Sequence, residues 1–351
     1  MPGIAVLTSG GDAPGMNAAL HAIVKLCAAR GVDVMGVEQG YDGLMAGRFR
    51  PLRPQDVDGI GHMGGTLLGS ARSKGFRTPA GRARAAQALE SLDGLLVIGG
   101  NGSLTGAHLL AQETGVRVIG LPASIDNDLG CTASAIGVDT ALNTIVDACD
   151  RIADTARAHR RVFVVEVMGR QCGYLAMASS IAVGADACLY REQGKGEAHI
   201  VAELEALLRR AYAPERNKLE VLILKAEGVE LPTPQLVRRL QDFSDRELGG
   251  VDVRGTVLGH VVRGGNPSYQ DRMIAGRLSA AAVGALLGGS TDEMVGWQPW
   301  TEGGIDTRDP SVKRFGLAQV LDETRALLDG TSPVTQRRVR QMETYAGVMG
   351  I

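Results

Sequence analysis

Short apolar runs alternate with longer amphipathic stretches along most of the chain. Most of the runs are rich in Val, Ile and Leu, as strands buried on both faces are. The six runs span Ile4–Leu7, Leu95–Ile98, Val116–Leu121, Val162–Val167, Ala185–Leu189 and Leu219–Leu224.

The stretches between these runs have the spacing of helices. From about Asp139 to Ala158, apolar residues recur every three or four positions, which predicts one buried helix face. A second helix is predicted from near Asn17 to Gly31, where glycine is a plausible C-cap. Alternating strands and helices of this kind predict an α/β fold with parallel sheets covered by helices.

Length and composition narrow the class of protein. The chain has 351 residues, which favours two domains over one core. It has 48 glycines and only 4% aromatic residues, which suits tight turns between strands and helices. The formal net charge of −2 argues against a nucleic-acid-binding protein, so any phosphate site must be built locally.

The cysteines and the apolar segments indicate a cytoplasmic protein. The five cysteines contain no CxxC pair, which argues against a disulfide framework and against a thiolate metal site. The N-terminus runs directly into a strand, and no apolar stretch is long enough to cross a bilayer, so neither a signal peptide nor a membrane partner is expected. Gln193–Gly196 and Thr301–Pro310 are predicted loops, the second followed by one more helix and a tail.

Glycine-rich turns follow three of the predicted strands, at Ser9–Gly11, Gly99–Gly102 and Pro122–Ser124. In open α/β sheets, ligands bind at the carboxyl ends of the strands, and glycine allows the backbone to approach a phosphate. Gly10 and Gly15 have the glycine spacing of a P-loop, but Met-Asn replaces its Lys-Ser/Thr. The turns therefore predict a phosphate site that is not a P-loop.

Charged residues accompany these turns and suggest the chemistry. Asp126 and Asp128 stand two residues apart after a strand, where one can act as a general base and the other can hold a metal. Single arginines beside small or glycine-rich segments suit bidentate capture of phosphate; they are Arg72, Arg161, Arg170, Arg254 and Arg263.

Six motifs in order resemble the ATP-dependent 6-phosphofructokinase family, of the A type. They read LTSGGDAPGMNAA, GGTLLGSAR, IGGNGSLTGA, SIDNDLGCT, VVEVMGRQCGYLA and VLGHVVRGGNP, and the match extends to about residue 300. The resemblance implies two Rossmann-like three-layer α/β domains with mostly parallel sheets. Residues 1–138 with about 262–312 would bind nucleotide, and 139–261 with about 313–351 would bind the sugar phosphate.

The resemblance also implies a role for individual residues. The ATP-binding residues would be Gly10, Tyr41, Arg72, Ser73, Gly100, Asn101, Gly102 and Ser103. The residues that bind fructose 6-phosphate would be Ser124, Asp126, Arg161, Met168, Gly169, Arg170, Glu227, Arg254, His260 and Arg263.

Within these sets, the resemblance makes Asp126 the base that takes the proton of the sugar 1-hydroxyl. Arg170 and Arg72 would stabilise charge in phosphoryl transfer, and Ser124 would supply a hydroxyl. Asp128 would lie near Mg²⁺, the expected cofactor with ATP.

Two further expectations concern the subunits and the donor. In the family, Arg161 and Arg254 reach into a neighbouring subunit, so a homo-oligomer, usually a tetramer, is implied. Pyrophosphate-dependent relatives carry aspartate at the position of Gly102 and lysine at that of Ala123. Both residues are small and neutral here, so ATP is the expected donor.

Three departures from the family leave alternatives open. Asn101 replaces an aspartate linked to the metal, so the metal site is expected to be weakened. In the family's effector site, His21 and Ala153 replace arginines and only Lys25 is retained. The segment Leu189–Glu192 also differs from the usual IPE, so regulation by ADP or phosphoenolpyruvate is expected to be weak.

The leading hypothesis is therefore phosphoryl transfer from ATP to the 1-hydroxyl of fructose 6-phosphate in glycolysis. A second hypothesis keeps the chemistry but uses another ketose phosphate, such as sedoheptulose 7-phosphate. A third is a weakly active or regulatory protein that binds sugar phosphate and nucleotide, supported directly only by Asn101.

Overall fold

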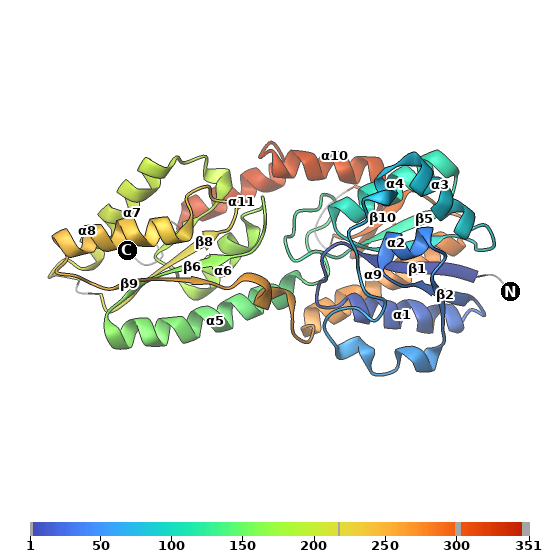
Figure 1. The fold of residues 1–351 in the computed structure, drawn as a ribbon, viewed down its shortest axis with the longest axis horizontal. Helices are drawn as coiled ribbons and strands as arrows, with labels where there is room; N and C mark the ends of the chain where they lie inside the picture. The colour runs from blue at the N-terminus through green and yellow to red at the C-terminus, as the bar shows by residue number, and fades with distance from the viewer. Residues whose placement is uncertain (1–2, 217, 299–302, 346–351) are drawn as a thin grey trace. The chain divides into compact units, whose positions relative to one another are not determined.

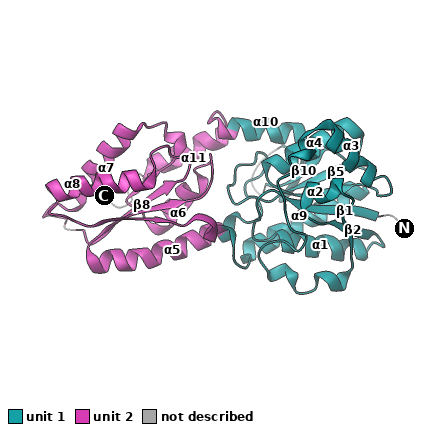
Figure 2. Ribbon diagram, viewed as in Figure 1, with its two compact units in different colours: residues 1–140, 263–326 teal, residues 141–262, 327–351 magenta. Residues whose placement is uncertain are grey.

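The computed structural model describes residues 3–216, 218–298 and 303–345. The chain forms two compact units, each assembled from separate segments (Figure 2). Unit 1 comprises residues 1–140 and 263–326, and unit 2 comprises residues 141–262 and 327–351.

Unit 1 contains an eight-stranded sheet in the order β11-β12-β10-β5-β4-β1-β2-β3. Strands β2, β1, β4, β5 and β10 run parallel, while β3, β12 and β11 add antiparallel edges. Every residue of β1, β4 and β5 is buried, as expected for central strands covered on both faces. The strands span Gly3–Ser9 (β1), Asp33–Val37 (β2), Phe49–Leu52 (β3), Leu95–Gly99 (β4), Val118–Pro122 (β5), Glu293–Trp297 (β10), Ile305–Asp306 (β11) and Val312–Gly316 (β12).

Helices cover both faces of the unit 1 sheet. Helices α1 and α9 pack together on one face, and α2, α3 and α4 lie on the other (Figure 1). The α-helices span Met16–Ala28 (α1), Gly40–Met45 (α2), Pro79–Ala88 (α3), Asn101–Thr114 (α4), Tyr269–Leu287 (α9) and Leu317–Leu328 (α10). The 3₁₀ turns are Pro54–Val57 (η1), Ile60–His62 (η2) and Gly75–Arg77 (η3).

Unit 2 contains a four-stranded parallel sheet in the order β7-β8-β6-β9. Helices α7 and α8 lie on one face and α5 on the other, while α6 packs on β7 and β8 (Figure 1). The strands span Val162–Val167 (β6), Ala187–Leu189 (β7), Val221–Ala226 (β8) and Val253–Val257 (β9). The helices span Val138–His159 (α5), Tyr174–Val183 (α6), Arg191–Gln193 (η4), Glu197–Ala211 (α7), Thr233–Glu247 (α8), Gly259–Arg263 (η5) and Pro333–Tyr345 (α11).

All six predicted apolar runs contain strands, and both predicted helices form. The sequence pattern missed β2, β3, β9, β10, β11 and β12. Edge strand β9 illustrates the reason, because it reads Val-Arg-Gly-Thr-Val and buries only Val253. A strand that is not covered on both faces needs no apolar run.

The C-terminal region differs from the prediction. The chain leaves unit 1 after residue 326 rather than near 312, because β12 pairs with β10 and keeps the chain in the unit 1 sheet. Two helices follow instead of one, since Pro333 begins a second. Of the predicted loop 301–310, residues 301 and 302 lie outside the described residues, and 305–306 form β11.

No helix in the described ranges is both long and apolar enough to cross a membrane. No disulfide joins any of the five cysteines. Burial raises the pKa of the Cys27 thiol to about 11 and that of Cys188 to about 12. These two thiols are therefore protonated at neutral pH.

Candidate functional site

Three turns meet at the carboxyl edge of the unit 1 sheet, after β1, β4 and β5. A Cβ added to Gly10 would lie 3.1 Å from the Ser103 hydroxyl, and one added to Gly100 would lie 3.5 Å from the Ser124 Cβ. Gly10 has φ +90°, a left-handed conformation that favours glycine. Gly10 is therefore beside Ser103, and Gly100 is beside Ser124, the predicted substrate-binding serine.

The segment from Gly64 to Ser73 is held against this edge by polar side chains of α1 and β1. Asn17 accepts a hydrogen bond from the Leu67 N–H (2.7 Å) and donates one to the Gly64 carbonyl (3.0 Å). The Thr8 hydroxyl donates to the Gly69 carbonyl at 2.8 Å. This support leaves Arg72 exposed and Ser73 half-buried at the same edge.

Tyr41 is buried rather than open to a ligand. Its ring stacks on Phe76 with centroids 3.8 Å apart, and its hydroxyl donates to the Ser103 carbonyl at 2.6 Å. Burial also raises the pKa of Tyr41, so the phenol stays protonated. In this structure Tyr41 therefore supports the Ser103 turn from beneath.

The segment Ser124–Asp128 presents two buried carboxylates. The Ser124 hydroxyl donates to Asp128 Oδ1 at 3.2 Å and accepts from the Asp126 N–H at 3.3 Å. Asn127 adopts φ +48°, and its side chain bonds the backbone of Ala133 and Ala135. The left-handed conformation of Asn127 thus turns the chain between the two aspartates, and Ser124 contacts both of them.

Arg263 lies beside Asp126. Its Nη2 is 3.7 Å from Asp126 Oδ1, and the arginine is only 8% exposed. Its Nη1 donates to the Asp12 carbonyl at 3.3 Å, and a Cβ added to Gly11 would lie 2.8 Å from that nitrogen. Gly11 therefore makes room for a guanidinium that reaches the predicted base.

The residues at this edge suit Mg²⁺ held partly by a triphosphate. No three His, Cys, Asp or Glu side chains form a metal-binding group among residues 3–216, 218–298 and 303–345. Asp126 and Asp128 supply hard carboxylate oxygens, and Asn101, the first residue of α4, supplies an amide oxygen. Mg²⁺ is commonly held by one or two carboxylates with phosphates and water, so the donors fit.

In unit 2, the turn after β6 is held by a carboxylate after β8. Glu227 Oε1 accepts hydrogen bonds from the N–H groups of Gly169 (3.2 Å) and Arg170 (2.6 Å). Arg170 is exposed and adopts φ +51°, unusual for a residue with a side chain. Met168 beneath it is buried. The structure therefore brings together Met168, Gly169, Arg170 and Glu227.

Arg161 and Arg254 are not part of this group. Both bind Asp252, Arg161 through Nε and Arg254 through Nη2, each at 2.9 Å. They lie near the amino ends of β6 and β9, whereas Arg170 follows the carboxyl end of β6. At about 3.3 Å per residue, the strand separates the two groups by roughly 17 Å. Within one chain, Arg161 and Arg254 therefore lie at one end of the unit 2 strands and Arg170 lies at the other.

His260 lies in η5, the segment that follows β9, and is exposed. The Leu258 N–H donates to the Glu166 carbonyl at 3.0 Å, which anchors the start of this segment to β6. His260 therefore leaves the same edge of the unit 2 sheet as Arg170 and Glu227.

Lys25, retained from the family's effector site, is paired within its own unit. Its ammonium bonds Asp58 Oδ1 at 2.6 Å, between two exposed side chains. His21 lies beside Gly61, where an added Cβ would be 3.6 Å from its ring. The Asp58 carboxylate therefore offsets the charge of Lys25, the cation retained at the family's effector position. The weak response to effectors stays a prediction.

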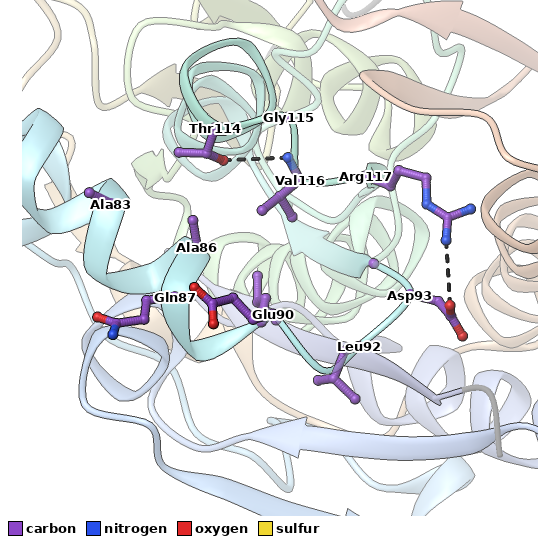
Figure 3. A pocket seen from close by; sticks show the side chains of 12 residues that line it. Ala83, Ala86, Gln87, Glu90, Leu92, Asp93, Thr114, Gly115, Val116 and Arg117 are labelled. Atoms are coloured by element: carbon purple, nitrogen blue, oxygen red, sulfur yellow. Dashed lines mark hydrogen bonds and ion pairs between the residues drawn. The ribbon is translucent and has the colours of Figure 1, made fainter.

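A cavity of about 560 Å³ lies at the amino ends of strands β4 and β5 in unit 1 (Figure 3). It is lined by residues before β4 and β5 and by the ends of α3 and α4, including Glu90 and Thr114. Its arginine, Arg117, is paired with Asp93 at 3.6 Å. Because it is at the amino ends of these strands, it is separate from the Asp126 edge.

Several supporting residues were not predicted. Asn17 belongs to a recognised motif, but its role depends on Gly64 and Leu67, which are distant in sequence. The buried Lys225 forms an ion pair at 3.0 Å with Glu166, whose side chain is 20% exposed. The available signal was a lysine directly after the apolar run Leu219–Leu224.

Comparisons with known proteins point to one family. The Phosphofructokinase family model matches residues 3–286. The chain is 44% identical over 326 residues to an ATP-dependent 6-phosphofructokinase of Thermotoga petrophila, covering 92% of this chain and 97% of that protein. It is also 44% identical over 298 residues to ATP-dependent 6-phosphofructokinase 2 of Bacteroides thetaiotaomicron, covering 84% and 88%.

A solved phosphofructokinase from Saccharomyces cerevisiae has a similar fold. The TM-score is 0.84 at 33% sequence identity, and the match covers 99% of this chain. This chain spans half of the yeast chain.

Proposed function

Because the chain belongs to the phosphofructokinase family, we propose that it transfers the γ-phosphoryl group of ATP to the 1-hydroxyl of fructose 6-phosphate. The products are fructose 1,6-bisphosphate, ADP and a proton. The observation that carries this assignment is the buried Asp126 beside Arg263, at an edge where three phosphate-type turns meet. A base, a cation and backbone N–H groups together suit transfer to an alcohol.

Asp126 accepts the proton of the 1-hydroxyl as the oxygen forms its bond to the γ-phosphorus. The bond between that phosphorus and the β,γ-bridging oxygen breaks, and ADP leaves. Arg263 places a guanidinium nitrogen 3.7 Å from Asp126 Oδ1. Ser124 orients Asp128 through its hydroxyl. Arg72 and Arg170 carry the charge-stabilising roles that the family assigns to them.

Asp128, with a weaker contribution from Asn101, would hold Mg²⁺ delivered with ATP. When bound, the ion neutralises charge on the β- and γ-phosphates. Asparagine supplies a carbonyl oxygen but no negative charge. The cost of Asn101 is therefore expected in metal affinity rather than in the fold.

ATP is the donor we assign. A Cβ added to Gly102 would meet no atom within 4 Å, so the space beside the α4 turn is open. In pyrophosphate-dependent relatives an aspartate occupies this position, and the open space here leaves room for a nucleotide. A Gly102→Asp variant is therefore a direct test of donor choice.

The oligomer is also a proposal. Arg161 and Arg254 lie at the opposite end of the unit 2 strands from Arg170 and Glu227, so one chain does not gather all these phosphate-binding groups in unit 2. A second copy that contributes the two arginines accounts for their placement. We propose a homo-oligomer, with a tetramer and a cytoplasmic location as the family expectations.

The test is a coupled assay with ATP or pyrophosphate as donor and a panel of ketose phosphates. Turnover of fructose 6-phosphate with ATP, at higher kcat/KM than any other pair, supports the assignment. A preference for sedoheptulose 7-phosphate would change the assigned substrate but leave the assigned reaction, phosphoryl transfer from ATP, unchanged. Binding of both ligands without turnover would favour the regulatory alternative.

A further inference from the structure

A lysine is buried inside the unit 2 sheet. Lys225, near the end of β8, is 1% exposed and faces Glu166 on the paired strand β6. Its ammonium donates to Glu166 Oε2 at 3.0 Å and to the Ala226 carbonyl at 3.4 Å. The Thr233 hydroxyl, at the start of α8, donates to the same carboxylate oxygen. Glu166 is thus held from both β8 and α8.

The pair lies at the base of the segments that carry the predicted sugar-phosphate residues. Two residues after Glu166 the chain enters the turn Met168–Arg170, and two residues after Lys225 it reaches Glu227. The Glu166 carbonyl accepts from Leu258, which precedes the His260 segment. The ion pair therefore joins the β6 and β8 segments, and the backbone of Glu166 joins the His260 segment to them.

The fit above the pair is close. A Cβ added to Gly228 would lie 2.2 Å from the Arg170 carbonyl, so the β8 exit and the β6 turn leave no space between them. The Glu227 N–H donates to the Val167 carbonyl at 2.9 Å. The hydrogen bonds from Gly169 and Arg170 to Glu227 therefore depend on how β6 and β8 are aligned.

Stability alone does not require these charges. Replacing a buried ion pair by uncharged residues of similar size is often neutral or stabilising, whereas a buried pair is well suited to fixing one register. Small displacements of substrate-positioning groups reduce rates strongly, by about 10²-fold for 1 Å.

We propose that Lys225 and Glu166 are positioning residues that align the ends of β6 and β8, and so set the geometry of Arg170 and Glu227 toward the sugar phosphate. The inference rests on the proposed function, because it assigns these residues to the fructose 6-phosphate side of the reaction. Neither residue touches the substrate in this assignment.

The test is the double variant Lys225→Met with Glu166→Gln, which removes both charges together and keeps an acceptor for Thr233. Single variants would leave one buried charge without its partner and risk misfolding. We expect kcat/KM for fructose 6-phosphate to fall about 10- to 100-fold. The KM for ATP should stay within about twofold, since the pair belongs to unit 2 and the Gly10 and Asn101 turns belong to unit 1.

The control is a second ion pair in unit 2, in which the Asp186 side chain is 3% exposed and the Lys218 side chain is 31% exposed. Lys218 bonds Asp186, and the other Asp186 oxygen accepts from Leu222 at 2.9 Å, near the amino ends of β7 and β8. Lys218→Met with Asp186→Asn should leave the KM for fructose 6-phosphate unchanged. Binding of fructose 6-phosphate, measured by calorimetry without ATP, should weaken only in the Lys225–Glu166 variant.

Two results would overturn the inference. One is a folded Lys225–Glu166 variant with unchanged kcat/KM and unchanged binding of fructose 6-phosphate. The other is an equal loss in the Lys218–Asp186 control, which would show a general effect of stability. Failure of the wild-type protein to phosphorylate fructose 6-phosphate would instead contradict the proposed function itself.

Discussion

Arg170 is the clearest case of a residue whose conformation is maintained by its surroundings. A left-handed φ costs an ordinary residue of order 1–3 kcal/mol and persists only where neighbours hold it. Here the Arg170 N–H bonds Glu227 at 2.6 Å, and Gly169 bonds the same oxygen. The charge of Arg170 is therefore presented by a preformed turn, before any ligand arrives.

Asp126→Ser should remove the proposed base. We expect kcat to fall about 10²- to 10⁴-fold, because a positioned general base contributes about that much. Affinity for fructose 6-phosphate should change little, since Arg170 and Glu227 remain. Steady-state kinetics and calorimetric binding measure the two effects separately. Asp93→Asn, at the other edge of the sheet, is the control, and near-normal turnover of Asp126→Ser would refute the role.

Asn101→Asp should restore a carboxylate at the start of α4. Magnesium affinity depends on ligand charge, so we expect half-maximal activity at a lower Mg²⁺ concentration and a higher kcat. The measurement is a magnesium titration with ATP and fructose 6-phosphate. An unchanged titration, or lower activity, would mean that Asn101 has another purpose, and a different donor or sugar would become the leading explanation.

At the level of elements, one aspartate joins the beginnings of α5 and α9. Asp271 is fully buried and accepts from the Gly137 N–H (2.8 Å), the Thr140 N–H (2.8 Å) and the Thr140 hydroxyl (2.5 Å). The Ser268 hydroxyl caps α9 by accepting from the Asp271 N–H at 3.2 Å. These bonds satisfy N–H groups that helix starts leave unpaired.

Asp271 should give stability a distinctive pH dependence. Burial is the largest effect on this carboxyl group and raises its pKa, while the Thr140 hydrogen bonds lower it. The folded state therefore holds the proton more tightly than the unfolded state. The stability that this group contributes is full below its ordinary pKa of about 3.9 and is lost as pH rises through the raised value.

The variant Asp271→Asn tests this sign. It should be less stable than the wild type, because one amide oxygen cannot accept all three hydrogen bonds. The difference in unfolding free energy should shrink as pH rises from about 4 toward 7, since only the wild-type side chain titrates. Urea unfolding at several pH values measures it. A difference that widens with pH would show that the carboxylate is favoured in the folded state.

At the level of the whole molecule, the exposed edge strand β9 of unit 2 is the feature that suggests contact with a second chain. Strand β9 has no further neighbour among the described strands, and Val257 and Val261 are 57% and 59% exposed. Open strand edges and apolar side chains together favour pairing with another chain. The same strand carries Arg254, which we assign to a neighbouring copy's substrate.

The double variant Val257→Asp with Val261→Asp should weaken assembly, because charges would be placed on this edge. We expect slower sedimentation and a higher KM for fructose 6-phosphate, since Arg161 and Arg254 would no longer reach a second site. Analytical ultracentrifugation and kinetics at several protein concentrations measure both. Leu109→Asp, on α4 of unit 1, is the control. A fully active wild-type monomer would contradict the oligomer proposal.

Much of the architecture was predictable from local pattern. The interior strands β1, β4, β5, β6 and β8 follow from apolar runs, because a strand covered on both faces needs apolar side chains throughout. The edge strand β7 was also found from its apolar run. Helix α5 follows from its three- and four-residue spacing. The order of six motifs was enough to indicate the family, and the family model and relatives confirm it.

The tertiary structure decided what depends on contacts between distant segments. The edge strand β9 and the antiparallel strand β12 carry no apolar run, so only pairing defines them. Strand β12 also moved the last crossing between the units. Arg263, Arg161 and Arg170 all stand beside similar motifs in the sequence. In the structure, however, Arg263 lies beside Asp126, whereas Arg161 lies apart from Arg170. Sequence specifies residue type and local period, whereas the distance between side chains on different strands is set only when the sheet forms.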